Sequence, residues 1–349
     1  MNKAIVLTNG LFLKINAKTA HGLVRGTEKF EIIGVVDGIE TAGKDAGELL
    51  DGKKRNIPIF SDVEKAVNAL PEINFLIVGV ATLGGVFPPD MLEIIRNAIQ
   101  NKISIVNGLH EYLSEKEELV SLAKENNVEL IDIRKPKSRK DLHFWTGEIW
   151  TVKAPIIAVL GMDCAMGKRT TARMIKEACL REGINMQMIY TGQTGWLQGG
   201  KYGFIFDSTL NDFVSGEIEH AIVSCWKETK ADFILLEGQS SLRNPSGPCG
   251  FEFLISGHAK NVILVHAPKR QYFDNEEHFG EIPSLASEIE IISKLGSKVI
   301  ALALNTEGCT FEESKFYQEH YQNLLNIPVL LPIEEGVEKI IPTLNALKP

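Results

Sequence analysis

The sequence has few of the features that mark secreted, membrane-spanning or nucleic-acid-binding proteins. Its 349 residues include only 5 cysteines, scattered without a CxxC pair, which favours reduced thiols in a cytoplasmic protein over a disulfide framework. No apolar run approaches the roughly 20 residues of a membrane span, and the N-terminus lacks the apolar core of a signal peptide. Lys and Arg total 37 against 45 Asp and Glu, a net charge of −8 without a basic excess for nucleic acid. We therefore expect a cytoplasmic protein whose substrates are small molecules.

A GxGxxG fingerprint is also absent, so a nicotinamide cofactor is not indicated. Residues 1–133 nevertheless alternate short apolar runs with amphipathic ones, the pattern of a parallel sheet with helices on both faces. We expect this part to be a Rossmann-like domain. The predicted strands lie in 4–10, 31–38, 73–81, 103–110 and 127–134, and the predicted helices in 61–70, 89–100 and 113–127.

A second α/β domain is predicted over residues 155–349, after a connection over 134–154. Its segment 134–150 holds five Lys and Arg residues and an aromatic cluster. Repeats and low-complexity tracts are absent, and the pattern is that of a P-loop NTPase-like parallel sheet. The predicted strands lie in 155–161, 184–192, 232–239, 260–268, 298–306 and 327–333, and the predicted helices in 168–183, 213–230 and 285–296.

The first strand of this domain leads into a phosphate-binding loop. Gly161 and Gly167 bound the loop and Lys168 follows, so backbone N–H groups, a helix N-terminus and a cation would meet one anion. The usual loop has four residues between its glycines and a hydroxyl directly after Lys, whereas here five residues intervene and Arg169 takes the hydroxyl's place. Magnesium is therefore not expected, and the alternative is a Gly-rich turn with an incidental Lys. The predicted ligand-binding residues are Gly161, Asp163, Cys164, Ala165, Gly167, Lys168, Arg169, Thr170 and Thr171.

Polar side chains gather where several predicted strands end. Because the carboxyl ends of parallel strands meet at one edge of a sheet, these side chains are candidates for substrate binding and catalysis. For each of them the alternative is a structural role, such as capping a helix or an ion pair at the surface. The candidates are Asp37, Gln193, Glu237, Gln239, Arg243, His266 and Arg270.

Three of these residue types suit particular tasks. Glu237 follows four apolar residues, where P-loop proteins carry a second acidic motif, and is a candidate magnesium ligand or general base. His266 ends another apolar strand and is a further catalytic candidate. Arg243 and Arg270 would suit a substrate carboxylate, which a guanidinium binds with two parallel hydrogen bonds.

Four segments resemble the D-glutamate N-acetyltransferase family: GMDCAMGKRTTA at 161–172, TGQTG at 191–195, EGQSSL at 237–242 and the N-terminal IIGVVDG with GKDAGELL. The resemblance covers nearly the whole chain and departs from the family pattern at Arg243 and Asn244. It implies a Rossmann-like domain followed by a P-loop domain, and acetyl transfer from acetyl-CoA to the amino group of D-glutamate or a related D-amino acid. The loop would then hold the phosphates of CoA.

Within that activity each candidate receives a role. Glu237 is the predicted base, and either Gln193 or the amides of 191–195 would stabilise the developing oxyanion. His266 is a further catalytic candidate. Arg243 and Arg270 would bind the substrate carboxylates, and Gln239 and Asp37 are placed with them as substrate-binding residues.

Two other classes of function stay open. Dethiobiotin synthetase also has five residues between its loop glycines, but Thr follows Lys directly there, whereas Arg169 does so here. An ATP-dependent ligase or kinase of that class, or a nucleotide-binding regulatory protein, is therefore the alternative, and magnesium-dependent ATP binding would favour it. We also expect a homo-oligomer.

Overall fold

The computed structural model describes residues 1–70 and 72–348 and divides into two compact units. The first comprises residues 1–136 and 192–200, and the second comprises residues 137–191 and 201–349. Each unit has its own hydrophobic core and is described by itself.

The first unit is built on a parallel sheet of six strands in the order β3-β2-β1-β4-β5-β6. This is the strand order of dinucleotide-binding folds, in which the direction of the connections changes between β1 and β4. The Rossmann-like prediction is therefore confirmed. The strands are β1 (Asn2–Leu7), β2 (Phe30–Val36), β3 (Ile59–Phe60), β4 (Phe75–Val78), β5 (Ser104–Asn107) and β6 (Leu130–Asp132).

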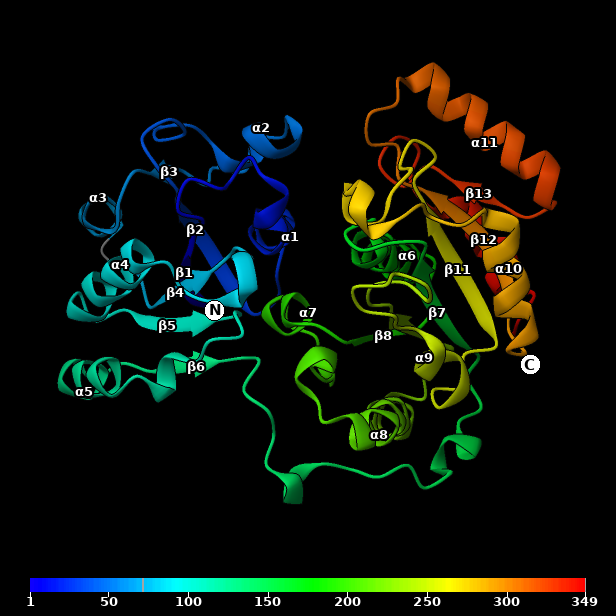
Figure 1. Ribbon diagram of the computed structural model, residues 1–349, viewed down its shortest axis with the longest axis horizontal. Helices are drawn as coiled ribbons and strands as arrows, with labels where there is room; N and C mark the ends of the chain where they lie inside the picture. Colours follow the sequence, from blue (N-terminus) through cyan, green and yellow to red (C-terminus); the bar gives the residue numbers. More distant parts are fainter. Residues whose placement is uncertain (71, 349) are drawn as a thin grey trace. The chain divides into compact units, whose positions relative to one another are not determined.

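Helices cover this sheet in two layers, with α3, α4 and α5 in one and α1, α2 and α7 in the other (Figure 1). Both layers bury apolar stripes, so the central strands are enclosed on each face. The helices are α1 (Lys18–Arg25), α2 (Ala46–Asp51), α3 (Val63–Ala69), α4 (Pro89–Gln100), α5 (Glu117–Asn126) and α7 (Gln193–Leu197). Short 3-10 turns lie at Ile15–Ala17, Leu83–Gly85 and Leu113–Glu115.

The second unit is built on a parallel sheet of seven strands in the order β13-β12-β11-β7-β10-β8-β9. Its central strands are buried along their whole length, as a sheet covered on both faces requires. The predicted strands are all present, which confirms the α/β prediction. They are β7 (Ile156–Gly161), β8 (Met186–Tyr190), β10 (Phe233–Glu237), β11 (Asn261–His266), β12 (Lys298–Leu304) and β13 (Val329–Leu330), joined by the short edge strand β9 (Tyr202–Gly203).

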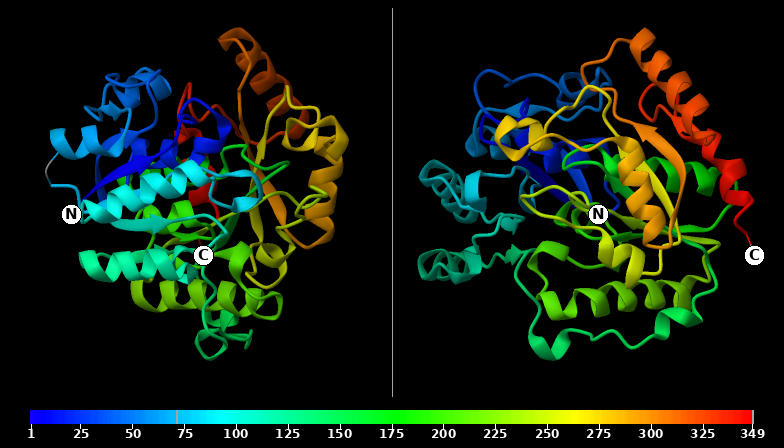
Figure 2. Two further views of the ribbon diagram at one scale, coloured as in Figure 1. Left: turned by 60° about the vertical axis from the view of Figure 1, so that its left-hand side comes forward. Right: turned by 45° about the vertical axis from the view of Figure 1, so that its right-hand side comes forward.

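Helices α6 and α8 lie on opposite sides of this sheet (Figure 1 and the right-hand view of Figure 2). The predicted helices correspond to α6, α8 and α10, whereas α11 was not predicted. The helices are α6 (Lys168–Arg181), α8 (Asn211–Thr229), α9 (Phe251–Ile255), α10 (Leu285–Lys294), α11 (Phe311–Leu325) and α12 (Ile341–Asn345). Short 3-10 turns lie at Arg139–Asp141, Glu148–Thr151, Phe206–Ser208, Phe273–Asn275, Glu277–Phe279 and Glu338–Ile340.

Residues 192–200 lie between β8 and β9 in the sequence but belong to the first unit. Leu197 is fully buried there, and the side-chain amide of Gln198 donates to the carbonyls of Gly22 and Gly26 at 2.7 and 2.9 Å. Thr194 and Thr19 share a hydroxyl hydrogen bond of 3.1 Å. The TGQTGW segment therefore begins at the end of β8 and continues as a helix that completes a layer of the Rossmann-like unit.

Residues 137–151, here called the strap, run along α8 in the second unit (Figures 1 and 2). They fall within the stretch that the sequence suggests as a connection between domains, and the structure packs them tightly. A Cβ on Gly216 of α8 would lie 1.9 Å from the carbonyl oxygen of His143, so only glycine permits this close approach. The boundaries predicted at residues 133 and 155 stay a prediction.

Across residues 1–70 and 72–348, no helix combines the length and the apolar character that crossing a membrane requires.

Candidate functional site

The loop between β7 and α6 turns the chain directly into a helix N-terminus. Ala165 and Gly167 adopt left-handed backbone conformations, with φ of 50° and 91°, and α6 begins at the next residue, Lys168. Glycine adopts this conformation without steric cost, whereas Ala165 is strained by it. The first amides of a helix lack partners within the helix, so the turn aims N–H groups at the space inside the loop.

Lys168 is buried within this loop. Its ammonium donates to the carbonyl oxygens of Asp163 and Ser240 at 2.7 and 2.6 Å. A Cβ on Gly161 would lie 3.1 Å from the Lys168 side chain, so glycine leaves room for the lysine stem. The predicted cation is thus held by the backbone oxygens of Asp163 and Ser240.

The shape of the loop depends on Asp163, which is fully buried. Its Oδ1 accepts from the side-chain amide of Asn244 at 2.8 Å, and its Oδ2 accepts from Arg270 at 3.1 Å and from the backbone N–H of Asp274 at 2.8 Å. Arg270 also donates to the carbonyl of Cys164 at 2.7 Å, and its side chain is only 4% exposed. A substrate carboxylate that bound Arg270 would have to replace one of these loop contacts.

Asp163, Cys164 and Asp274 form the one group of three potential metal ligands among residues 1–70 and 72–348. Its carboxylate oxygens already accept hydrogen bonds, since Asn244 also donates to Asp274 at 3.0 Å. Burial raises the pKa of the Cys164 thiol, which donates to the Ser240 hydroxyl at 3.3 Å. The group therefore acts as an internal hydrogen-bond network, and a thiol with a raised pKa is a poor nucleophile.

Glu237 lies at the end of β10, the strand that pairs directly with β7. Its carboxylate is almost fully buried and contacts Arg169 at 2.5 Å, with the backbone N–H of Thr191 at 3.4 Å from the same oxygen. Thr191 donates its hydroxyl to the Glu237 carbonyl at 2.7 Å and accepts from the Gln239 amide at 2.9 Å. The structure thus joins the ends of β8 and β10 to the first turn of α6.

Arg169 stands where common P-loops carry the magnesium-binding hydroxyl. Its guanidinium pairs with Glu237, the acidic residue predicted as a base or magnesium ligand. Thr170 follows and is partly exposed, while Thr171 is buried with its N–H bound to the carbonyl of Gly167. A cation at Glu237 would have to displace this ion pair.

Arg243 lies on the segment after β10 and reaches α10. Its Nε donates to Glu288 at 2.7 Å and its Nη1 donates to the Ser287 hydroxyl at 2.7 Å. Burial raises the pKa of Glu288, and the contact with Arg243 opposes that rise. Removing Arg243 would leave a buried carboxyl group unpaired, so its contacts hold α10 in place.

Two further predicted residues lie in the first unit. The carbonyl oxygen of Gln193 accepts from Arg134 at 2.9 Å, which makes the Nε2 amide its donor end. Asp37 is buried after β2 and accepts from the hydroxyls of Thr8 and Thr41 at 2.8 and 2.7 Å and from the N–H of Phe12 at 3.0 Å. Asp37 thus orders the loops that follow β1 and β2.

His266 ends β11 and packs against α11. Its Nε2 lies 3.1 Å from the Tyr321 hydroxyl, and its buried Nδ1 has no hydrogen-bond partner among the described residues. Burial lowers the pKa of His266 to about 4, so the ring is neutral near pH 7. A neutral imidazole accepts or donates one hydrogen bond at each nitrogen, and here the phenol of Tyr321 takes one of them.

This burial predicts a pH dependence of stability. The folded-state pKa of about 4 lies below the ordinary value of 6.5, so the unfolded chain binds the proton more readily. Stability should fall as the pH drops from 6.5 to 4, by as much as about 3 kcal/mol from this residue. Urea unfolding of the wild type and of His266→Gln at several pH values measures the difference, and His278→Gln, an exposed histidine, serves as control. Equal slopes in wild type and His266→Gln would contradict the assignment.

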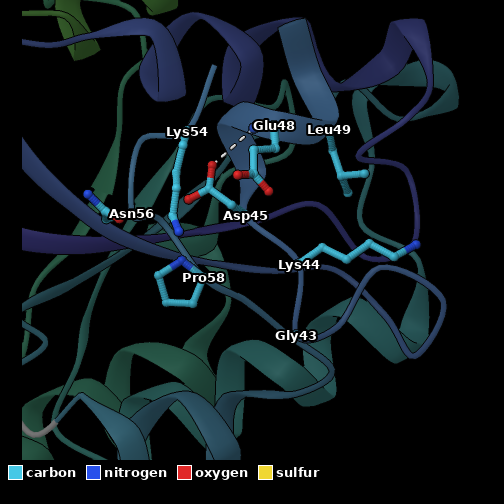
Figure 3. Close-up of a pocket in the computed structure, with 8 residues that line it drawn as sticks. All are labelled: Gly43, Lys44, Asp45, Glu48, Leu49, Lys54, Asn56 and Pro58. Atoms are coloured by element: carbon cyan, nitrogen blue, oxygen red, sulfur yellow. Dashed lines mark hydrogen bonds between the residues drawn. The ribbon is translucent and has the colours of Figure 1, made fainter. Parts of the chain in front are cut away.

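A hollow of about 530 Å³ lies in the first unit beside α2 (Figure 3). Asp45 accepts hydrogen bonds from four backbone N–H groups there, and Figure 3 shows the one from Glu48. Lys44 extends away from the other labelled side chains. The hollow is lined by Gly43, Lys44, Asp45, Glu48, Leu49, Lys54, Asn56 and Pro58. Asp45 is engaged in shaping the turn.

Sequence reasoning assigned no role in the loop to three residues that shape it: Ser240, Asn244 and Asp274. Ser240 has a left-handed φ of 38° and presents its carbonyl to Lys168. Asn244 is fully buried and bridges Asp163 and Asp274. The polar run after β10 was the available signal, but nothing in the sequence pairs it with Asp274.

Comparison with known proteins agrees with this architecture. Residues 143–341 match a family model described as a P-loop domain of unknown function, DUF1611_C, and residues 39–136 match a Rossmann-like domain of unknown function, DUF1611_N. The chain belongs to the DUF1611 family.

Similar proteins of this family include two named relatives and one crystal structure. A protein of a Pseudoalteromonas species named D-glutamate N-acetyltransferase is 31% identical over 275 residues, which span 77% of this chain and 80% of that protein. A protein of the same name from Tritonibacter scottomollicae is 24% identical over 279 residues, 78% of this chain and 81% of its own length. The crystal structure of a DUF1611 protein from Anabaena variabilis is 25% identical, with a TM-score of 0.90 over 99% of this chain and 100% of that one.

Proposed function

We propose that this DUF1611 protein is an N-acetyltransferase that moves an acetyl group from acetyl-CoA to the amino group of D-glutamate or a related D-amino acid. The observation that carries the proposal is the relative of that name, 31% identical over 77% of this chain. The loop gives independent support, because Arg169 replaces the hydroxyl that holds magnesium in nucleotide-hydrolysing loops. The five free cysteines agree with the cytoplasmic location that we propose with it.

The loop has the chemistry needed to hold the phosphates of CoA. It offers the buried ammonium of Lys168 together with the amides at the start of α6. The left-handed turn at Ala165 and Gly167 brings backbone close to a ligand. The residues proposed to bind CoA are Gly161, Asp163, Cys164, Ala165, Gly167, Lys168, Arg169, Thr170 and Thr171. Asp163 and Cys164 would do so by shaping the loop.

Acetyl-CoA supplies the acyl group as a thioester, and the chain must handle the proton. An amine attacks only when it is neutral, so a base has to accept a proton as the new bond forms. We propose Glu237 for this role, since it is the buried carboxylate next to the loop and Arg169 already orients it. Gln193, through its Nε2 amide, or the amides of residues 191–195 are the proposed donors to the acetyl oxygen, and His266 is proposed as a further catalytic residue.

Substrate recognition is proposed to use Gln239, Arg243, Arg270 and Asp37. Each of them already has partners in the structure, so substrate carboxylates would compete with these contacts. The exchange is favourable only where a bidentate pair replaces a weaker hydrogen bond. Both arginines already pair with a buried carboxylate, Arg270 with Asp163 and Arg243 with Glu288, so a substrate carboxylate would have to share either guanidinium with that partner.

The test is release of CoA thiol from acetyl-CoA in the presence of D-glutamate, L-glutamate and other D-amino acids. We expect turnover with D-glutamate or a related D-amino acid and none with L-glutamate. Calorimetry with acetyl-CoA, ATP and GTP, each with and without magnesium, measures which of these ligands binds. Acetyl-CoA should bind with the same affinity whether or not magnesium is present. Magnesium-dependent ATP hydrolysis without CoA release would assign the chain to the ligases or kinases. Nucleotide binding without turnover would indicate a regulatory protein.

Replacing Lys168 by methionine tests the phosphate anchor. Methionine keeps the length of the buried stem but removes the charge, so the affinity for acetyl-CoA should fall about 10- to 100-fold, as loss of a charge-assisted contact predicts. Calorimetric titration with acetyl-CoA measures the change. Lys294→Met on α10, an exposed lysine, is the matched control and should leave the affinity unchanged. An unaltered affinity in Lys168→Met would place the CoA phosphates elsewhere.

A further inference from the structure

The strap is held on α8 by two carboxylates that the proposed chemistry does not use. Glu217 is 1% exposed and accepts from the ammonium of Lys137 at 2.6 Å and from the backbone N–H and ring Nδ1 of His143 at 3.0 and 2.8 Å. Two buried acidic residues on one helix are costly unless they are fully paired. Here the pairing is supplied by the strap itself.

Glu219, the second of these carboxylates, is 3% exposed and binds the other half of the strap. It accepts from the N–H and hydroxyl of Thr146 at 2.6 and 2.9 Å and from the N–H of Ile149 at 3.0 Å. Together with the Gly216 contact, these bonds fix the strap backbone from Lys137 to Ile149. The strap is therefore an ordered segment that is fixed to α8, rather than a loose connection.

The strap presents large apolar side chains to solvent. Phe144, Trp145 and Trp150 are 65%, 39% and 62% exposed, which is unusual for such residues. The indole N–H of Trp145 donates to the carbonyl of Ser256, directly after Ile255 at the end of α9. Trp145 and Trp150 pack edge to face, with ring centroids 6.0 Å apart. The two tryptophans thus lie against each other, with Trp145 bonded to the end of α9, while Phe144 packs on Phe213 of α8 with ring centroids 4.5 Å apart.

Helix α9 extends the same surface. Phe251 and Ile255 are four residues apart, so they share a face of the helix, and they are 40% and 56% exposed. The Trp150 ring packs edge to face on His258, just beyond this helix, with centroids 4.8 Å apart. We call the five apolar side chains Phe144, Trp145, Trp150, Phe251 and Ile255 the strap patch.

We propose that the strap patch is the surface through which two copies of this chain associate. Side chains of this size carry about 150–250 Å² each, so at these exposed fractions the patch presents on the order of 500 Å² of apolar surface. That matches the largest patches on monomers, about 300–600 Å², which are often functional. It also supplies most of the roughly 800 Å² that each partner buries in a stable interface.

The charges beside the patch favour a second copy over a membrane. A two-fold interface brings the same surface together twice, so it must be complementary to itself. The strap carries both signs, with exposed Arg139 and Lys140 next to Asp141, and with Glu148 paired to Lys227. An anionic lipid surface would instead select a consistently basic rim, and the whole chain carries a net charge of −8.

Sedimentation velocity on the full chain tests the proposal, over protein concentrations from about 1 to 100 µM, the range in which affinities of this size are resolved. The wild type should sediment at twice the chain mass of 38.6 kDa. Phe144→Ser with Trp150→Ser should raise the dissociation constant at least tenfold, as loss of about 1.4 kcal/mol requires. Ile255→Lys, a single exposed change outside the strap, should act in the same direction.

The matched control replaces two equally exposed residues elsewhere in the same unit, Phe316→Ser with Leu324→Ser on α11, both 64% exposed. This variant should remain associated. The proposal is overturned if the wild type stays monomeric at the highest concentration, or if both patch variants associate like the wild type. It is also overturned if only the α11 variant dissociates, or if monomeric protein co-sediments with phosphatidylserine vesicles. Near-UV circular dichroism reports that each variant is folded.

Discussion

Glu237→Gln is expected to lower kcat for acetyl transfer by about 10²- to 10⁴-fold, the contribution usual for general acid–base catalysis. The substitution keeps the size and one hydrogen-bonding oxygen of the side chain but removes its ability to take a proton. Because Glu237 is buried and paired with Arg169, loss of its charge also removes this ion pair. The measurement is the pH profile of kcat and kcat/KM with acetyl-CoA and the preferred amine.

The pH profile separates a base from a residue that only positions Arg169. If Glu237 takes the proton, the acidic limb of kcat/KM should vanish in Glu237→Gln. If it only orients Arg169, the limb should persist and Arg169→Met should reproduce the loss. Glu290→Gln, an exposed carboxylate on α10, is the control and should retain wild-type rates. If Glu237→Gln keeps full turnover and the wild-type pH profile, Glu237 is not the base. That result would leave the acetyltransferase proposal intact.

Much of the second unit was predictable because its signals are local. Five apolar residues followed by a glycine-bounded loop and a helix give β7, the loop and α6 in one continuous stretch. Glu237 was also found, because it ends an apolar run that pairs with β7 in the sheet. Short-range periodicity and a known loop geometry were sufficient here.

The surroundings of the loop were not predictable, since they depend on contacts across long stretches of chain. The role of Arg270 in binding a substrate carboxylate stays a prediction, but its contacts with Asp163 and Cys164, 106 or more residues earlier, were not predicted. No periodic pattern encodes that pairing. Gln193 was predicted from its place after β8, but Gln198 and Thr194 anchor its helix to residues about 175 positions away.

Helix α11 shows a different kind of failure. Its first residues contain a capping box, in which Thr310 and Glu313 bond each other's backbone N–H groups. The capping signal was present in the sequence but was overlooked. Phe311 and Phe316 lie on the exposed side of this helix, so its apolar residues do not form the one-sided pattern by which a helix is usually recognised. A capping box can identify the N-terminus of a helix even where the apolar residues of that helix show little periodicity.

Asp163→Ala is expected to destabilise the second unit by about 3–5 kcal/mol, the usual loss when one partner of a buried ion pair is removed. Arg270 would keep its charge in a site where it is 4% exposed, and it would retain the Cys164 carbonyl and a longer contact with Glu307. Asn244 would lose an acceptor at the same time. Urea unfolding followed by far-UV circular dichroism measures the change, and acetyl-CoA affinity should fall with it because the loop loses its brace.

The control for this prediction is Glu307→Ala, which removes the exposed partner of the same arginine. An exposed ion pair contributes about 0–1 kcal/mol, so the two substitutions should differ several-fold although each deletes one carboxylate contact of Arg270. Combining Asp163→Ala with Arg270→Met should recover part of the loss, since the uncompensated charge is then gone. If Asp163→Ala costs no more than Glu307→Ala, the loop keeps its shape without this network, and the left-handed turn at Ala165 and Gly167 alone must account for it.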